Sequence, residues 1–530
     1  MLFTSFRFLE FLTLLFLIYY LIPSKWQWKL LLAASYFFYF CADPVYLIYI
    51  AATTITTWYT GIRIVKIRGV RDAYIKENKE SLTKDEKKAY KAVMKKKTWR
   101  WTLACLLLNL GILAVVKYTN FMISNINSVI SAVGGDGTLN FVNIIVPLGI
   151  SFYTFQSMGY IIDVYRDTVE AEKNPFKFAL FVSFFPQLIQ GPISRFGDLK
   201  QTLFSPHKFD RKNVAFGLQR ILWGFFKKLV IADRIVVAVN TLIHNTDSYT
   251  GAYVFVGMLF YALELYADFT GGIDITIGIA QTLGIKVTEN FNRPYFSKNI
   301  KEYWNRWHIT MGSWFTDYIF YPISVCKPML KLSKASRKHL GEVIGKRVPV
   351  YLSSFVVWFA TGIWHGASWN FIVWGLGNWL VIMISQEFDP LYAKFHKKFN
   401  VKDKFFFRLF QVVRTVLLMS SLRMFDCYRD VPLTFKMFGT MFTEWNWDVI
   451  WNGALLHIGL SAIDYIVLAV CTVLLIAVSL VQRTGSVREK ITALPYWFKF
   501  AIWYGLFLIV LLMGAYGIGY DSSQFIYNQF

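Results

Sequence analysis

The sequence predicts an all-α polytopic membrane protein, with about 12 transmembrane helices and a few short re-entrant helices. Of its 530 residues, 55% are hydrophobic and 18% are aromatic, and only 17% are charged, whereas soluble domains carry about 25% charged residues. Long apolar runs recur along the chain, and basic stretches separate them. That alternation is typical of membrane spans whose inner loops hold the positive charge.

The excess of basic residues does not indicate nucleic acid as a partner. Lys and Arg number 56 against 33 Asp and Glu, which gives a formal net charge of +23. Because these residues gather between apolar spans, membrane topology and contact with anionic lipid headgroups explain them. We therefore expect membrane lipids as partners, no nucleic acid, and every basic loop on the cytoplasmic side.

The N-terminal part predicts helices up to a first re-entrant segment. Residues 7–62 hold about three spans by apolar length, and the first run lacks the basic start and small-residue cleavage site of a removed signal. Residues 63–100 are a basic cytoplasmic loop, 101–116 a span, 121–133 an outer-surface segment and 142–162 an inward span. Residues 178–193 are short for a span and rich in Pro and Gln, which favours a re-entrant segment over a kinked helix.

The next two spans carry charges that cannot face lipid cheaply. Residues 213–240 include Lys227, Lys228, Asp233 and Arg234, and residues 254–283 include three carboxylates, Glu264, Asp268 and Asp274. We expect these groups to pair with one another inside the protein. No metal site is predicted, because the carboxylates lack histidine partners and the five cysteines are scattered without ligand spacing.

The remaining chain predicts a second re-entrant segment and the last spans. Residues 304–323 are re-entrant, 327–347 form a basic loop, 348–364 rise to His365 and 371–385 return. The expected segments that follow are a basic loop at 394–408, a span at 409–425, an outer loop at 427–453, spans at 455–481 and 498–516, and a basic loop at 483–490. We expect both termini outside and one domain over 1–530, with a core at 140–380 and C-terminal helices at 405–530.

Two histidines, each directly after a tryptophan, are the candidate functional groups. Imidazole at the end of an apolar span is costly unless it is neutral and hydrogen-bonded, so His365 is a functional candidate. Gly362 and Gly366 bracket it and permit close approach of a backbone or a ligand. A neutral histidine there can act as a general base on a hydroxyl. The alternative is a core histidine bonded to a carbonyl. His308 lies near charged residues and is expected at the cytoplasmic face, and its alternative is a structural histidine bonded to a helix end or to a carboxylate.

The stretches around both histidines resemble the membrane-bound O-acyltransferase family, and within it the membrane subunits of alginate and peptidoglycan O-acetyltransferases. The resemblance rests on Trp304-Asn305-Arg306-Trp307-His308 and on Gly362-Ile363-Trp364-His365-Gly366-Ala367-Ser368-Trp369. Further segments agree, at 147–156, 184–193, 223–228, 289–295 and 524–530.

The resemblance implies roles for particular residues and molecules. His365 corresponds to the catalytic histidine and His308 to the second signature position. The donor is then cytoplasmic acetyl-CoA, with no tightly bound cofactor, and the acceptor is an exported polysaccharide at a bacterial inner or plasma membrane. A separate extracytoplasmic acetyltransferase-like protein completes the transfer, and the tail at 525–530 is a candidate contact for it. We expect the following to line the substrate tunnel: Trp304, Arg306, Trp307, Asp317, Trp364, Gly362, Gly366, Ser368, Gln156, Gln187 and Gln190.

The chain departs from the subgroup at several positions, and two other functions stay open. Thr316 stands where the subgroup usually has arginine, Pro322-Ile323-Ser324-Val325 replaces its Pro-Leu-Gly-Gly, and residues 424–429 lack its usual Phe-Phe-Arg-Ala. One alternative is a D-alanyl transferase of teichoic-acid modification, which would use a carrier-protein thioester. The other is a transporter of lipid-linked sugars, which would show internal repeats and would not need His365.

Overall fold

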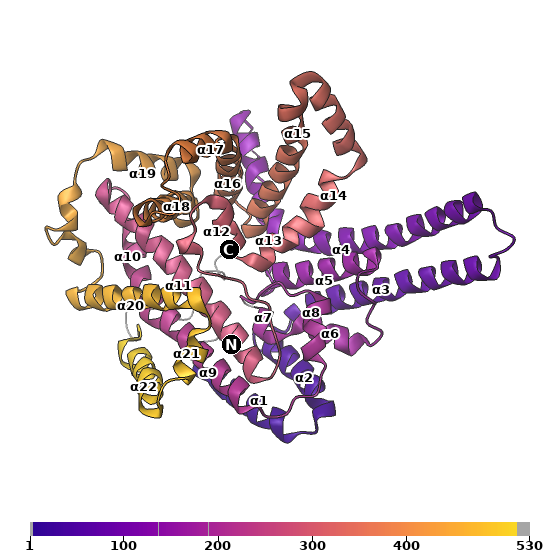
Figure 1. Cartoon of the computed structure of the whole chain (residues 1–530), viewed down its shortest axis with the longest axis horizontal. Coiled ribbons are helices and arrows are strands. Elements are labelled where there is room, and N and C mark those ends of the chain that lie inside the picture. Colours follow the sequence, from indigo (N-terminus) through magenta and orange to yellow (C-terminus); the bar gives the residue numbers. More distant parts are fainter. Residues whose placement is uncertain (1–3, 136, 189, 517–530) are drawn as a thin grey trace. The chain divides into compact units, whose positions relative to one another are not determined.

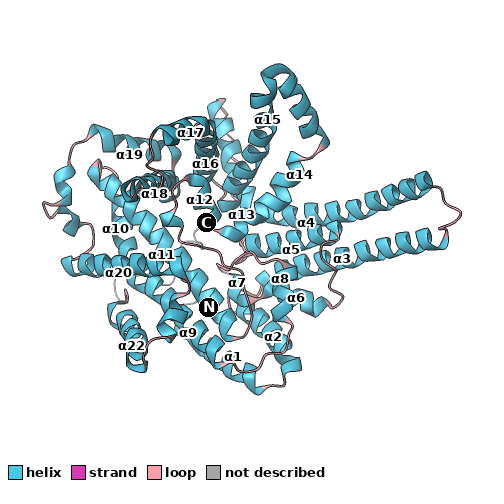
Figure 2. Cartoon of the chain, in the orientation of Figure 1, coloured by secondary structure: helices cyan, strands magenta, loops and turns pink. Residues whose placement is uncertain are grey.

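A computed structural model describes residues 4–135, 137–188 and 190–516. Within these ranges every regular element is a helix, as predicted (Figure 2). The tail at 525–530 lies outside the described residues. Contacts divide the chain into two compact units, one mainly of residues 6–214 with 280–287 and the other mainly of residues 215–279 with those from 288 onward. The expectation of one domain stays a prediction.

The first unit begins with α1 (Phe6–Leu21), α2 (Gln27–Phe40) and α3 (Tyr46–Glu77), where three spans were expected. The prediction of a loop at 63–100 is wrong in its secondary structure, because α3 continues to Glu77 and α4 (Lys84–Ala132) starts seven residues later. A capping box between Thr83 and Glu86 begins α4. Figure 1 shows α3 and α4 side by side as a long hairpin. Helix α4 also includes nearly all of the segment at 121–133 that was predicted to lie along the outer surface.

The first predicted re-entrant segment is a broken helix. It comprises α6 (Pro175–Ser183) and α7 (Phe185–Leu188), which follow α5 (Ile150–Arg166) and precede α8 (Phe196–Leu203). Gly149 starts α5 at φ +69°, and a Cβ there would lie 2.2 Å from the Leu188 carbonyl oxygen. Only glycine permits both that backbone angle and that approach. The break favours the re-entrant interpretation, which stays a prediction.

The charged spans of the second unit form ion pairs, as predicted. Helix α9 (Arg211–Phe225) continues through a π-helical turn (Phe226–Ala232) into α10 (Asp233–His244), and these pack on α11 (Ala252–Thr282). Lys228 Nζ lies 2.7 Å from Asp233 and 2.6 Å from Asp268. Asp274 pairs with Lys227 and Arg220. Glu264, which is buried, has no ion pair among the described residues.

Short helices are followed by long helices in the region that contains His308 and His365. Helices α12 (Ile300–Arg306) and α13 (Ile309–Phe315), a π-helical turn (Thr316–Phe320) and α14 (Tyr321–Ser324) cover the segment at 304–323, whose re-entrant course stays a prediction. The loop expected at 327–347 is instead helical, since α15 runs from Lys327 to His365 with a kink at Gly341. Helices α16 (Trp369–Glu387) and α17 (Asp389–Lys398) follow.

Three of the last helices of the second unit overlap predicted spans: α18 (Phe405–Tyr428), α20 (Ala462–Val481) and α22 (Tyr496–Met513). Two others, α19 (Val431–Thr443) and α21 (Val487–Thr492), lie where loops were expected. The predicted outer loop at 427–453 contains α19. Among the described residues, 6 helices are long and apolar enough to cross a membrane, or 7 if the bent pair α16–α17 is one span. The chain is thus polytopic. The predicted number of about 12 spans is reached only if shorter helices also cross the membrane.

Candidate functional site

His308 occupies a tight turn between two short helices. Its φ of +50° is in the left-handed region, which a non-glycine residue rarely adopts without local support. Asn290 supplies that support: its backbone carbonyl accepts from Ile309 N at 2.9 Å, and its Oδ1 accepts from the backbone N and hydroxyl of Thr310. The turn therefore fixes the imidazole of His308 in one place.

The His308 ring is almost wholly enclosed, with 1% of the residue exposed. Phe269 covers it at a ring-centroid distance of 5.0 Å. Burial, and to a smaller extent the Arg423 guanidinium, lowers the pKa of His308 to about 3. The ring is therefore neutral at physiological pH, since burial disfavours the charged form of the imidazole.

His365 is the last residue of α15, and its ring is also buried. It packs against Trp374 of α16, with ring centroids 4.6 Å apart. Gly362 and Gly366 make this geometry possible. A Cβ at Gly362 would lie 2.6 Å from the Phe371 carbonyl oxygen, and a Cβ at Gly366 would lie 2.2 Å from the Phe371 ring. The predicted close approach of another backbone is confirmed at Gly362, whereas at Gly366 a side-chain ring approaches instead.

Trp364 brings the two histidines into one cluster. Its ring centroid lies 5.8 Å from that of His308 and 5.0 Å from that of His365. The two motifs are far apart in the sequence, so only the packing of α12–α13 against α15 places both imidazoles on the same indole. Two buried imidazoles, from motifs far apart in the sequence, thus pack against one indole.

Arg423 of α18 completes the cluster, and the sequence analysis missed it. Its guanidinium carbon lies 4.6 Å from the ring centroid of Trp374 and 5.3 Å from that of Trp307. Its Nη1 lies 2.6 Å from Asp426 Oδ2, and both side chains are buried. The tryptophan faces and the Asp426 carboxylate that surround the Arg423 guanidinium compensate its buried charge. An arginine and an aspartate three residues apart in an apolar helix were the available signal.

Other predicted site residues lie near this cluster with structural contacts. Trp304 donates from Nε1 to Asn378 Oδ1 at 3.2 Å and packs edge-on against Trp374. Ser368 donates to Asn370, which in turn donates to the Phe425 carbonyl of α18. These bonds join α12, α16 and α18 around the two histidines.

Arg306 and Asp317 are the two remaining residues of the second unit that were predicted to line the tunnel. Arg306 pairs with Glu302 on its own helix at 2.6 Å. Asp317 is half-buried on the π-helical turn after α13. Their part in a substrate tunnel stays a prediction.

The three glutamines belong to the first unit. Gln156 Nε2 donates to Gln187 Oε1 at 3.3 Å, and Gln187 Nε2 donates to Ser194 Oγ at 2.5 Å. Gln190 is wholly buried, and its amide has no hydrogen-bond partner within the described ranges. Gln156, Gln187 and Ser194 thus form a polar cluster, and a tunnel-lining role for the three glutamines stays a prediction. No group of three or more His, Cys, Asp or Glu in the described part of the chain could hold a metal ion.

Comparison with known proteins agrees with this geometry. Residues 170–428, which include both histidines and Arg423, match the membrane-bound O-acyltransferase family. The probable alginate O-acetylase AlgI of Azotobacter vinelandii is 35% identical over 393 residues, covering 73% of this chain and 70% of that protein. The peptidoglycan O-acetyltransferase of Helicobacter pylori is 29% identical over 71% and 67% of the two chains.

A more distant relative has a different named substrate. The teichoic acid D-alanyltransferase of Bacillus subtilis is 31% identical over 49% of this chain and 62% of that protein. All three relatives are named as enzymes that transfer or esterify acyl groups, which disfavours the transporter alternative. The resemblance noted in the sequence is confirmed: this chain is an acyltransferase and belongs to the membrane-bound O-acyltransferase family.

Proposed function

We propose that this enzyme takes acetyl groups from cytoplasmic acetyl-CoA and passes them across the membrane for O-acetylation of an exported or cell-wall polysaccharide. The similarity to alginate O-acetylase over most of both chains carries this proposal. A separate extracytoplasmic protein completes the transfer to the polysaccharide. The membrane is the bacterial plasma or inner membrane, which the chain crosses about 12 times when shorter helices are counted with the long ones.

His365 is the general base in this proposal. Its imidazole nitrogen takes the proton of the acceptor hydroxyl while the hydroxyl oxygen attacks the thioester carbonyl. The carbon–sulfur bond then breaks, an oxygen ester remains on the acceptor, and the CoA thiolate takes the proton back from the imidazolium. The surrounding indoles exclude water, which would otherwise hydrolyse the thioester. His308, held neutral in its turn, positions Trp364 and so the His365 ring.

A basic cavity beside the middle of α15 suits the donor. It has a volume of about 1170 Å³. Six cationic side chains and two carboxylates line it, together with aromatic rings: Lys298, Lys301, Lys346, Arg347, Lys402, Arg414, Asp389, Asp403, Tyr351, Tyr392, Phe395, Phe407 and Phe410. This combination fits the phosphates and the adenine of CoA. Tyr351 lies about 21 Å along α15 from His365 by helical rise, so the donor needs a long arm such as pantetheine.

A D-alanyl transferase is the second candidate, because a relative with that named activity is 31% identical over half of this chain. Its donor would be a carrier protein that bears a thioester-linked D-alanine. The carrier would need only its phosphopantetheine arm inside the enzyme, and the cationic cavity would then meet its acidic surface.

The test is to identify the esterified group. Cells that express the wild-type enzyme, His365→Ala or no enzyme, at matched membrane levels, are grown, and the esters on their envelope polymers are released with mild base. Acetate that appears only with the wild-type enzyme supports the proposal. D-alanine in place of acetate would favour the second candidate, and unchanged acetate with His365→Ala would refute the role of His365.

The donor cavity has its own test with purified enzyme and acetyl-CoA. We expect Lys346→Gln with Arg414→Gln to raise the KM for acetyl-CoA about tenfold and to change kcat little, because phosphate contacts act on binding. The control is Lys436→Gln, which removes one charge from α19. An unchanged KM would exclude this cavity as the phosphate site.

A further inference from the structure

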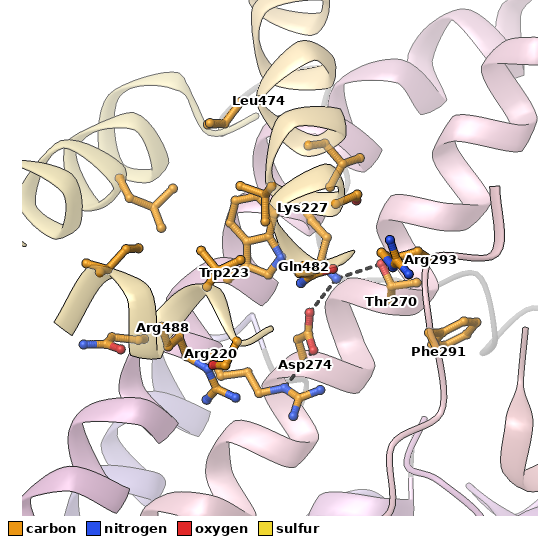
Figure 3. Close-up of a pocket in the computed structure, with 18 of the residues that line it drawn as sticks. Arg220, Trp223, Lys227, Thr270, Asp274, Phe291, Arg293, Leu474, Gln482 and Arg488 are labelled. Atoms are coloured by element: carbon orange, nitrogen blue, oxygen red, sulfur yellow. Dashed lines mark hydrogen bonds and ion pairs between the residues drawn. The ribbon is translucent and has the colours of Figure 1, made fainter. Parts of the chain in front are cut away.

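A network of charged side chains lines a large cavity of the second unit. The cavity has a volume of about 700 Å³, and its lining comes from α9, α11, the loop at 289–293 and helices α20, α21 and α22. Arg220, Lys227, Asp274 and Glu289 lie together on its wall. Figure 3 shows Arg220, Lys227 and Asp274 joined by dashed contacts. Side chains of α9, its π-helical extension, α11 and the loop thus meet at one charged wall.

Arg220 is the centre of this network. Its Nε donates to Asp274 Oδ1 at 2.8 Å, and its two terminal nitrogens donate to the two carboxylate oxygens of Glu289 at 2.5 and 2.6 Å. Lys227 Nζ donates to the other Asp274 oxygen at 2.6 Å, so the aspartate is held from both sides. A bidentate bond fixes the direction of a carboxylate as well as its distance. Arg220 is therefore fixed on α11, and it fixes Glu289 on the loop.

The two carboxylates that bind Arg220 differ in exposure. The side chains of Arg220 and Asp274 are 12% and 15% exposed, whereas that of Glu289 is 59% exposed. Asp274 compensates the charge of the enclosed guanidinium. Glu289 is hydrated and needs no ion pair for its solvation, and exposed pairs add little to stability. The bond to Glu289 therefore serves mainly to fix the geometry of the loop.

Glu289 begins the loop that supports the His308 turn. Asn290, the next residue, accepts the three hydrogen bonds that hold the residues after His308. Asn292 N donates to the Arg306 carbonyl at 2.9 Å, on the other side of the same turn. The loop thus binds the turn both before and after His308. Residues 285–291 have no regular secondary structure, so contacts with neighbouring elements must fix their course.

Two residues where the loop meets the turn have a left-handed backbone. The φ angle is +50° at His308 and +49° at Arg293, which ends the loop. Residues other than glycine rarely adopt such angles, and they keep them only where their surroundings over-determine the backbone. The bond between Arg220 and Glu289 ties the start of the loop to α9. Its loss should therefore let the turn relax and the His308 ring move.

We propose that Arg220 is a positioning residue for acyl transfer. By clamping Glu289, it holds the loop at 289–293 and so keeps the His308 ring against Trp364, which packs on His365. Arg220 acts through the loop and takes no part in the chemistry. This inference rests on the proposed roles of His365 and His308, and it does not depend on which acyl group is transferred.

The first test compares kcat and KM of purified variants with acetyl-CoA. Arg220→Gln and Glu289→Gln should each lower kcat by about three- to tenfold, because a small misplacement of a catalytic group is costly. The KM for acetyl-CoA should stay within about twofold of the wild type, since this network does not bind the donor. The double variant should lose no more than either single variant, because both substitutions remove the same contact.

The second test measures the turn directly by hydrogen–deuterium exchange in peptides that cover residues 306–312. The backbone amides of Ile309 and Thr310 donate to Asn290, so both should exchange slowly in the wild type and about tenfold faster in Arg220→Gln and Glu289→Gln. Arg234→Gln is the matched control, because it removes another enclosed arginine–aspartate pair, which joins α10 to α20. It should lower the thermal midpoint and leave kcat and these amides unchanged.

Several outcomes would overturn the proposal. Wild-type exchange in Glu289→Gln would show that the clamp does not hold the turn. A lowered kcat with unchanged exchange would mean that Arg220 acts by another route, and an equal fall of kcat in Arg234→Gln would mean that general stability explains the loss. The exchange test needs no acyl donor. If acetyl transfer fails as the proposed function, exchange at the turn still decides whether Arg220 positions it.

Discussion

The two tryptophan–histidine motifs differ in how the chain holds the imidazole, although both rings pack against Trp364. His308 sits in a left-handed turn that is held by hydrogen bonds to Asn290, a residue of another loop. His365 ends a 39-residue helix, and two glycines let α16 pack against it. A helix end positions a side chain with little strain, whereas a strained turn persists only where its surroundings over-determine it.

The different surroundings of His365 and His308 indicate different roles for the two imidazoles. The His365 ring lies at the C-terminal end of α15 and packs against Trp364 and Trp374, and Phe371 fills the space beside the two glycines. The His308 ring is enclosed by aromatic rings and the buried Arg423, and its low pKa keeps it neutral. We infer that His365 meets the reacting atoms and that His308 positions it.

Replacing each histidine tests this division most strongly. We expect His365→Ala to lower kcat by about 10² to 10⁴, the usual contribution of a general base. His308→Asn should lower kcat by a smaller factor, about tenfold, because it acts through Trp364. Rates of acetyl transfer by purified enzyme, with circular dichroism to verify folding, measure both. An equal loss in the two variants would break the distinction.

The Arg423–Asp426 pair should have the next largest effect. Arg423→Gln leaves the Asp426 carboxylate buried without its partner, which costs about 3–5 kcal/mol of stability in comparable pairs. Arg423→Gln with Asp426→Asn should recover much of that loss, since no charge then remains uncompensated. Thermal unfolding in one detergent compares the variants. A double variant no more stable than the single one would show that the guanidinium acts mainly through its tryptophan contacts.

Replacing Gly362 tests the close packing of α15 against α16 beside His365. A Cβ there would meet the backbone of Phe371 and Ile372 at 2.6 and 3.1 Å, so Gly362→Ala must displace α16. We expect a loss of about 1–3 kcal/mol, as for other overpacked sites. The matched control is Gly439→Ala in α19, where a Cβ meets nothing within 4 Å. Equal thermal midpoints for the two variants would contradict the packing argument.

The sequence predicted the helical class, the two histidines and the pairing of most buried charges, because each leaves a local trace: an apolar run, a costly imidazole or a carboxylate in a span. It failed where the deciding contact is distant. The basic stretches at 63–100 and 327–347 look like loops in composition, yet their residues favour helix, and α3 and α4 support each other by pairing. Arg423 was missed because its tryptophan partners come from α12, from the turn after α12 and from α16, all far from it in the sequence.

The smallest expected effect is a pH dependence of stability that belongs to His308. Its folded pKa of about 3 lies below the unfolded value of about 6.5, so the unfolded chain binds the proton first as the pH falls. The stabilisation is therefore complete above pH 6.5 and is lost as the pH falls towards 3, by about 2 kcal/mol at pH 5. His308→Gln should flatten the fall of the thermal midpoint between pH 7 and pH 5, because all other groups titrate alike in both proteins. Identical slopes would mean that the His308 ring accepts a proton in the folded state, and would remove the basis for treating the two histidines as different.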